Sequence, residues 1–273
     1  MFASDMRVVR RRGDRASRRV LPAIVFALAI TGGTVAQATR AAPLEDSHAL
    51  QRQREPTRRD AVAFELRRRD AAQRGTLVPD DDPVLRRLRR IDAELIAAAP
   101  RTAHQSLDWR WELNLFRDRT TPPLCLLGGK LMLARSLPRA LRATDDELAA
   151  LLAHAMAHAL LGHEGSMPGR TRYAPGLRSR YTVGEERAAD RTAIELAARA
   201  GYDPRAAIAL KHRLESLAQP AARAWSAMHR DYAGRADVIL AAVRTALPLF
   251  ARARGVLPGR LPPYVSNFGE RVD

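Results

Sequence analysis

The chain has little of several residue types that define common protein classes. Its 273 residues include one cysteine, Cys125, which cannot form an internal disulfide. Only Lys130 and Lys211 are lysines, so 44 of the 46 basic residues are arginine. The longest hydrophobic segment, residues 20–30, is shorter than a membrane-spanning helix requires and is interrupted by Pro22. No cysteine directly follows that segment, which argues against a lipid-modified protein.

The first 38 residues have the pattern of an export signal. Seven arginines precede the apolar segment, and Ala36-Gln37-Ala38 after it fits a small-x-small cleavage site. We therefore predict a signal peptide over residues 1–38 and a periplasmic protein, soluble or peripherally associated with a membrane. Residues 17–21 partly resemble a twin-arginine signal, so the export route stays open. An uncleaved anchor is the alternative to cleavage.

Hydrophobic and basic residues are abundant. Hydrophobic residues make up 46% and charged residues 28% of the sequence, which favours a globular protein with a substantial core. The net charge of +16 stays strongly positive without the export signal. Solvated arginines on helix surfaces explain this charge most simply, and we expect no nucleic-acid partner. Attraction to anionic lipid or lipopolysaccharide is the sharper alternative.

The mature chain is expected to have three parts. Residues 39–79 should form a basic linker or N-terminal arm, with a helix from Asp60 to Arg74 that stops at Gly75. Residues 80–256 should form the main domain, and residues 257–273 a C-terminal tail that packs back on it. Four prolines predict that the end of the chain breaks into a short helix and an extended segment: Pro248, Pro258, Pro262 and Pro263.

A helix and two strands are predicted at the start of the main domain. Asp82-Pro83 is a helix-start signal, and apolar residues at core spacing predict a helix that ends near Pro100. Residues 107–115 alternate between apolar and polar, which predicts a half-buried strand with both of its tryptophans in the core. Residues 124–134 should be extended, with a bend at Gly128-Gly129 where the backbone approaches another group closely.

The segment that follows predicts a buried helix with two histidines on one face. Thr144 and Glu147 have the spacing of a capping box, and leucines recur around most of the helix circumference. His154 and His158 are four residues apart, so both side chains can reach one ion. A satisfied core histidine would be the usual interpretation of either residue alone.

The pair belongs to a zinc-protease motif that lacks its acid. In H-E-x-x-H the two histidines hold zinc, and the glutamate between them activates the attacking water. Here Ala155 occupies the glutamate position. The metal-binding part of the motif is therefore present and the proton-transfer part is missing.

A second helix is expected from Glu186 to Ala200, ended by Gly201. Glu186 and Asp190 share a face of this helix, so one can complete a three-ligand metal site while the other orients a ligating histidine. Two solvated surface acids are the alternative. The turn-rich residues 164–184 between the two helices should form a solvated loop, with a lid over the site as the second possibility.

Several blocks in this order resemble the zinc metallopeptidases of family 48, the HtpX-like and prenyl-endopeptidase-like enzymes. The resemblance spans residues 126–204 and is strongest to exported bacterial members that act in outer-membrane protein quality control. Its blocks are a P-G-G-K-like turn, the motif helix, an E-x-E-A-D-like segment and its continuation: residues 127–130, 145–163, 186–191 and 200–204. His229 and Arg235 match a histidine and an arginine that the family places six residues apart.

The resemblance implies a fold and a metal site. The fold would be α+β and mainly helical, a zincin-like (gluzincin) peptidase domain with a small β-sheet beside the motif helix. His154, His158 and Glu186 would hold Zn²⁺, and Asp190 would accept a hydrogen bond from a ligating histidine.

The resemblance also implies residues that act on a substrate. His229 would face the metal-bound water or a transition-state oxyanion, and Arg235 would hold it there. A polypeptide substrate would add as a strand to a sheet edge. The residues implied for that edge are Lys130, Leu131, Met132 and Leu133.

Three departures from the family pattern bear on activity. Ala155 replaces the general base, Ala188 replaces a second acid, and Pro122 stands where the family has an asparagine. General acid–base catalysis contributes about 10²–10⁴-fold, so the missing glutamate predicts strong impairment. Glu164 should lie beyond the end of the motif helix and Glu185 should point elsewhere on its own helix, so neither acid is expected to replace the missing base.

Three functions therefore compete. The first is a periplasmic zinc-metallopeptidase homologue that binds metal and unfolded or envelope polypeptides, such as outer-membrane proteins, with little turnover. The second is an active endopeptidase with a surrogate base. The third is a basic module that binds anionic envelope components and retains a relic metal site.

Overall fold

The computed structural model describes residues 44–99, 109–163, 181–229, 233–269 and 271–272. The predicted signal peptide and most of the predicted loop over residues 164–184 lie outside these ranges. Within them, no helix combines the length and the apolar composition that crossing a membrane requires. The architecture is mainly helical with a small mixed sheet, which confirms the α+β expectation.

Helix α1 (Leu44–Gln73) starts well before Asp60, so the expectation of a linker is wrong from Leu44 onward. The helix packs on the sheet through Phe64, whose side chain is 1% exposed and contacts an apolar cluster there. The buried carboxylate of Asp60 accepts a hydrogen bond from the N–H of Leu127 at 3.1 Å. Sequence composition suggested an arm, but these contacts place α1 in one compact unit with the rest of the described chain.

Helix α2 (Pro83–Ala98) follows the sequence prediction closely. The carboxylate of Asp82 accepts hydrogen bonds from the N–H groups of Val84 and Leu85, which satisfies donors that the first turn leaves free. The apolar stripe is fully buried and comprises Leu85, Leu88, Ile91 and Leu95.

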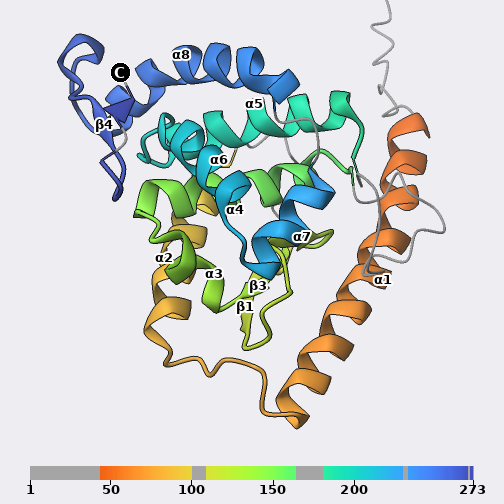
Figure 1. Cartoon of the computed structure of the whole chain (residues 1–273). Coiled ribbons are helices and arrows are strands. Elements are labelled where there is room, and N and C mark those ends of the chain that lie inside the picture. The colour runs from red at the N-terminus through yellow and green to blue at the C-terminus, as the bar shows by residue number, and fades with distance from the viewer. Residues whose placement is uncertain (1–43, 100–108, 164–180, 230–232, 270, 273) are drawn as a thin grey trace, which may run out of the picture. The chain divides into compact units, whose positions relative to one another are not determined.

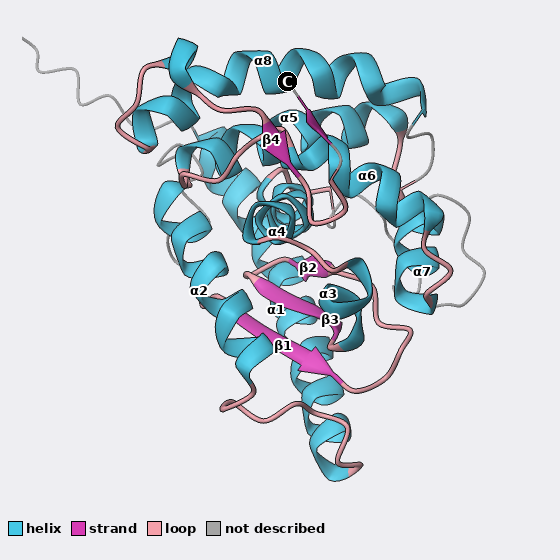
Figure 2. Ribbon diagram, turned by 60° about the vertical axis from the view of Figure 1, so that its left-hand side comes forward, coloured by secondary structure: helices cyan, strands magenta, loops and turns pink. Residues whose placement is uncertain are grey.

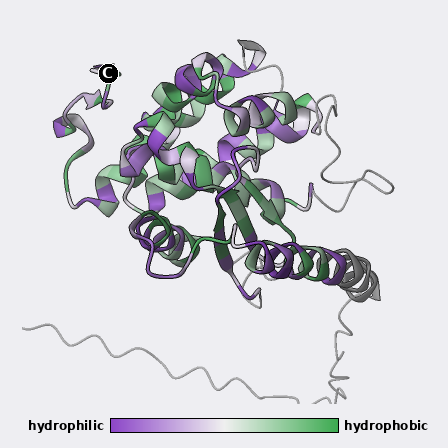
Figure 3. Cartoon of the chain, turned by 60° about the horizontal axis from the view of Figure 1, so that its bottom comes forward, coloured by the Kyte–Doolittle hydropathy of each residue, from purple (hydrophilic) through white to green (hydrophobic). Residues whose placement is uncertain are grey.

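The three-stranded sheet has the order β1–β3–β2. Its strands are β1 (Glu112–Phe116), β2 (Leu124–Leu126) and β3 (Lys130–Ala134). Strand β3 pairs parallel to β1 and antiparallel to β2. Residues 107 and 108 of the predicted strand lie outside the described ranges. From residue 109 onward the strand begins at Glu112, and the two tryptophans before it are partly buried. The strands carry mostly hydrophobic residues (Figure 3).

The central place of β3 overturns one prediction. Lys130, Leu131 and Met132 pair with β1 on one side and with β2 on the other, and Leu133 pairs with Leu115 of β1, so the central strand β3 is not an open sheet edge. On the outer side of β1, the N–H of Val78 bonds to the carbonyl of Leu115 at 3.0 Å. No strand among the described residues pairs with the outer side of β2. Among the described residues, β2 is therefore an edge strand of the sheet.

The predicted close approach at the glycine pair is confirmed. Gly129 has φ +75°, and a Cβ atom added there would lie 2.7 Å from Cδ2 of Trp111. The carbonyl of Gly129 also accepts a hydrogen bond from the N–H of Glu112 at 2.9 Å. Only glycine fits this turn without strain, because it combines a left-handed backbone with an indole packed against the chain.

Helix α4 (Asp145–Leu160) lies between the sheet and helix α5 (Val183–Arg199), and α8 (Ala236–Ala253) covers α5 (Figures 1 and 2). A short helix, α3 (Ser136–Leu141), connects β3 to α4. Nearly every side chain of α4 is buried, as its leucine and alanine content predicts. Alternate strand residues face either α4 or α1, so both faces of the sheet are covered.

The chain ends with helices and short strands. These are α6 (Ala206–Ser216), α7 (Pro220–Met228), the 3₁₀ turns η1 (Ala233–Arg235) and η2 (Pro258–Arg260), β4 (Tyr264–Val265) and β5 (Arg271–Val272). The predicted break at Pro248 is wrong, because α8 continues through it. Pro248 and Arg244 are both exposed, so the carbonyl group freed by the proline lies on the solvent side.

The tail after α8 packs back on the domain, as expected. The hydroxyl groups of Tyr264 and Thr144 are 2.9 Å apart, and Asn267 donates a hydrogen bond to the carbonyl of Arg142. These contacts hold the tail against the start of α4.

Candidate metal centre

The first two histidines of the site come from one helix, and local sequence explains their placement. The side-chain oxygen of Thr144 accepts from the N–H of Glu147, whose carboxylate accepts from the N–H of Thr144, so the predicted capping box is present. The helix then places His154 and His158 on one face. Both are buried, and their Nε2 atoms lie 3.1 Å apart.

The carboxylates come from α5, which starts at Val183 rather than at the predicted Glu186. A second capping box, between Thr182 and Glu185, sets this start. Glu186 in the first turn and Asp190 one turn later are both buried, so the alternative of two solvated acids is wrong. The buried face of α5 packs along α4 and carries these acids to the histidines.

His229 and Arg235 complete the cluster from the chain after α7. His229 caps the C-terminal end of α7, and Arg235 ends the 3₁₀ turn η1. Arg235 is fully buried and forms ion pairs with Glu186 and Asp190. The family resemblance implied that both residues lie at the site, whereas no local pattern in the sequence indicates it.

The donor atoms have the spacing of a coordination sphere. Nε2 of His154 is 3.3 Å from Nδ1 of His229 and 3.5 Å from Oε2 of Glu186. Oε1 of Glu186 is 2.8 Å from Nδ1 of His229 and 3.8 Å from Nε2 of His158. Ligands about 2.0–2.2 Å from one tetrahedral zinc would be about 3.3–3.6 Å apart. These four buried residues, whose donor atoms all lie within 4.8 Å of one another, could hold a metal ion.

Asp190 has a different position from the four donors. Its Oδ1 lies 3.1 Å from Nδ1 of His154, the nitrogen that faces away from the donor cluster. A carboxylate in that place fixes the imidazole ring and leaves its other nitrogen free to bind a metal. The structure thus brings together every residue implied for metal binding, and adds His229 as a fourth donor within reach.

Burial and charge shift the pKa values of this cluster in opposite directions. Burial opposes a charge on His154, but hydrogen bonds to Asp190 and Glu186 outweigh it and raise its pKa to about 9. Burial lowers the pKa of His229 to about 4, despite the nearby Glu186. Burial and the charge on His154 also lower the pKa of His158. For Glu186, burial opposes ionisation, but His229 and His154 outweigh it and hold the pKa well below its usual range.

The buried cluster carries one more negative than positive charge when all of its histidines are neutral. Two buried carboxylates, Glu186 and Asp190, face one buried guanidinium, Arg235. In the metal-free protein the proton on His154 supplies the second positive charge. A divalent cation bound by His154 would displace that proton and would give the cluster one positive charge more than the two carboxylates carry.

Aromatic rings enclose the imidazoles. Tyr181 stacks on His158 with ring centroids 3.6 Å apart, and Trp225 lies against His229 at 3.9 Å. Trp225 also meets the ring of His154 edge-on at 5.3 Å. Sequence reasoning missed both rings, since neither has a recognisable spacing to the motif.

Ala155, which lies between the two histidines in sequence, is buried. The carboxylate of Glu185 accepts hydrogen bonds from the backbone and hydroxyl of Thr182, and so is occupied in the cap of α5. Glu164 lies outside the described residues. Glu186 is the one carboxylate in the described donor group.

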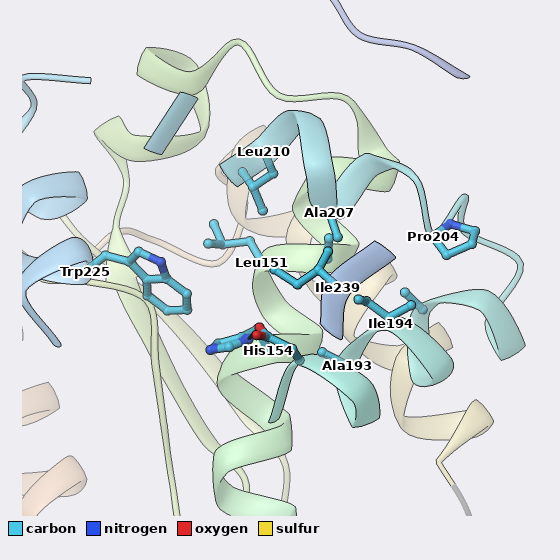
Figure 4. Close-up of a pocket in the computed structure, with 12 residues that line it drawn as sticks. Leu151, His154, Ala193, Ile194, Pro204, Ala207, Leu210, Trp225 and Ile239 are labelled. Carbon is cyan, nitrogen blue, oxygen red and sulfur yellow. Dashed lines mark ion pairs between the residues drawn. The ribbon is translucent and has the colours of Figure 1, made fainter. Parts of the chain in front are cut away.

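An apolar cavity lies behind His154 (Figure 4). Its walls include Asp190 and Trp225, but neither His158 nor Glu186 lines it. The cavity therefore adjoins the back of one donor rather than the place where the donors converge. Its apolar walls help to explain the burial of His154.

No protein-family model matches this chain, and no curated protein has a significant match to it.

Proposed function

We propose that this protein is a zinc-binding homologue of the family 48 metallopeptidases that binds polypeptides and has lost efficient turnover. The observation that carries the proposal is the convergence of His154, His158, Glu186 and His229, with Ala155 at the sequence position of the catalytic acid. The zincin-like fold, the family relationship and the periplasmic location belong to the same proposal. The motif blocks and the export-signal pattern support them.

The donor set favours zinc among divalent ions. Imidazole nitrogens and a single carboxylate are common zinc ligands, whereas calcium and magnesium prefer sites built from oxygen alone. The donors are buried and held by Asp190, Tyr181 and Trp225. Such support favours retention of a bound ion.

Two features argue against efficient hydrolysis. Zinc would polarise a carbonyl group or bound water, but the methyl group of Ala155 cannot accept a proton from that water. In addition, Nδ1 of His229 is close enough to the donor atoms of His154 and Glu186 to bind the same ion as a fourth ligand. Four protein donors are typical of zinc sites that keep their metal, whereas catalytic sites keep a position open, so hydrolysis by any variant would require water to take the place of His229 at the ion.

The polypeptide would bind along the side of β2 that faces away from β3, where no strand among the described residues pairs with it. Strand β2 also contacts α4. Strand addition supplies main-chain hydrogen bonds to any sequence, which suits an unfolded or envelope polypeptide such as an outer-membrane protein. This placement replaces the edge expected at residues 130–133.

The test compares the unmodified protein with Ala155→Glu. Bound zinc is measured by elemental analysis, and proteolysis is measured as cleavage of casein. We expect about one zinc in each and cleavage only with Ala155→Glu, with a gain of about 10²-fold or more. The double variant His154→Ala and His158→Ala is the control and should bind no zinc. Equal, chelator-sensitive cleavage by both proteins would favour the active endopeptidase. Absence of zinc from both would leave the relic-site alternative, with salt-sensitive binding to anionic lipid.

A further inference from the structure

The C-terminal end of α4 folds back on one of the donor histidines. Gly162 has φ +72°, a left-handed conformation that commonly ends helices. The N–H of His163 then donates a hydrogen bond to the carbonyl of His158 at 2.9 Å. This backbone bond returns the chain over the preceding turn, so that His163 lies beside His158 although the helix has ended.

The side chains of these two residues also meet. Nδ1 of His163 is 3.0 Å from Nδ1 of His158, with ring centroids 5.1 Å apart. The other nitrogen of His158, Nε2, faces Nε2 of His154. The two nitrogens of His158 therefore have separate environments, one toward the donor cluster and one toward His163.

We propose that His163 is a positioning residue for the metal site: its Nδ1 accepts a hydrogen bond from Nδ1–H of His158 and so presents Nε2 of His158 to the ion. The inference rests on the proposed zinc-binding function. A histidine that binds metal through Nε2 carries its proton on Nδ1 and needs an acceptor there. Nδ1 of His163, 3.0 Å away, is that acceptor when His163 carries its own proton on Nε2.

The two motif histidines are thereby held by unlike partners. His154 donates to the carboxylate of Asp190, whereas His158 donates to a neutral imidazole. A neutral acceptor orients the ring without adding a third buried negative charge to a cluster that already holds Glu186 and Asp190. Tyr181 stacks on the face of His158 and restricts the same ring from another direction.

The test measures zinc affinity by competition with a chromogenic chelator for the unmodified protein, His163→Ala and His163→Asn. Alanine keeps the backbone bond at the helix end but removes the acceptor. Asparagine places its amide oxygen near the position of the histidine Nδ1. We expect His163→Ala to bind zinc about 10–100-fold more weakly and His163→Asn to recover most of that loss. His212→Ala, which removes an exposed histidine on α6, is the matched control and should not change the affinity.

The outcomes separate this inference from the proposed function. Tight zinc binding by His163→Ala, or equal weakening by alanine and asparagine, would overturn the role of His163 while leaving the metal site intact. Lack of zinc binding by the unmodified protein would instead overturn the proposed function. Nitrogen-15 NMR of the zinc-loaded, unsubstituted protein gives a test that needs no variant. It should show the proton of His158 on Nδ1 and a coupling across the bond to His163, and a proton on Nε2 of His158 would contradict the proposal.

Discussion

The indole of Trp225 lies against the imidazole of His229, with ring centroids 3.9 Å apart and the ring planes inclined by 35°. The same indole meets His154 edge-on at 5.3 Å. One tryptophan thus contacts two of the four residues that could hold a metal ion. The other described tryptophans, Trp109 and Trp111, pair with each other near the glycine turn.

This contact makes Trp225 a reporter of metal binding. Zinc should displace the proton on His154, and because protonated imidazole quenches indole emission, tryptophan fluorescence should rise as zinc is added at neutral pH. Trp225→Phe should lose the response, whereas Trp109→Phe should keep it. A response that survives in Trp225→Phe would place the bound metal elsewhere.

Asp190→Asn should weaken metal binding without abolishing it. The carboxylate holds Nδ1 of His154 at 3.1 Å, and loss of such a partner typically costs about 10–100-fold in metal affinity. Chelator competition on folded protein, checked by circular dichroism, measures the change. Glu195→Gln is the control, because Glu195 lies on the exposed face of the same helix and pairs with Arg199. Equal affinities for the two variants would argue against a role for Asp190.

Metal affinity should depend on pH in a defined direction. The pKa of His154 is raised to about 9, so the metal-free protein carries a proton there at pH 7 and must lose it when the ion binds. The apparent affinity should therefore rise by about tenfold per pH unit from pH 7 toward pH 9, and level off above. Calorimetry in buffers of different ionisation enthalpy should count about one proton released at pH 7 from this group. A heat of zinc binding at pH 7 that is the same in all buffers would contradict the prediction.

The same shift affects stability of the metal-free protein with the opposite sign. The folded pKa of His154 exceeds its ordinary value of 6.5, so its contribution to stability is fully present below pH 6.5. That contribution is lost as the pH rises through about 9. Urea unfolding of metal-free protein and of His154→Gln at pH 6 and pH 9 should show the difference between them shrinking. The pKa of His229 is lowered to about 4, so His229 should stay neutral at both pH 6 and pH 9 and should not contribute to this difference.

Gly129→Ala should destabilise the fold more than Gly75→Ala, which changes a glycine of similar backbone conformation in open space. Both Gly129 and Gly75 have positive φ, and alanine there costs about 1–2 kcal/mol. At Gly129 the added Cβ would also lie 2.7 Å from Trp111, while at Gly75 nothing lies within 4 Å. Urea unfolding should therefore show a larger loss for Gly129→Ala than for Gly75→Ala. Equal losses would mean that the indole moves aside at little cost.

The sequence predictions succeeded where local rules decide the structure. The cap at Asp82, the capping box at Thr144 and the glycine bend before β3 depend on residues within a few positions of one another, and each is confirmed. Predictions failed where packing overrides local preference. Polar composition suggested a linker at the start of α1, and Pro248 suggested a break in a helix that continues.

The sequence by itself determined that His154 and His158 share one helical face, since helical periodicity is local, and that Ala155 lies between them without a proton acceptor. Only the tertiary structure decided what surrounds that face. The packing of α5 against α4 brings Glu186 to the histidines, and the chain after α7 returns His229 to the same point. Strand order likewise placed residues 130–133 at the centre of the sheet. These outcomes depend on burial of apolar surfaces far apart in sequence, which no short-range pattern encodes.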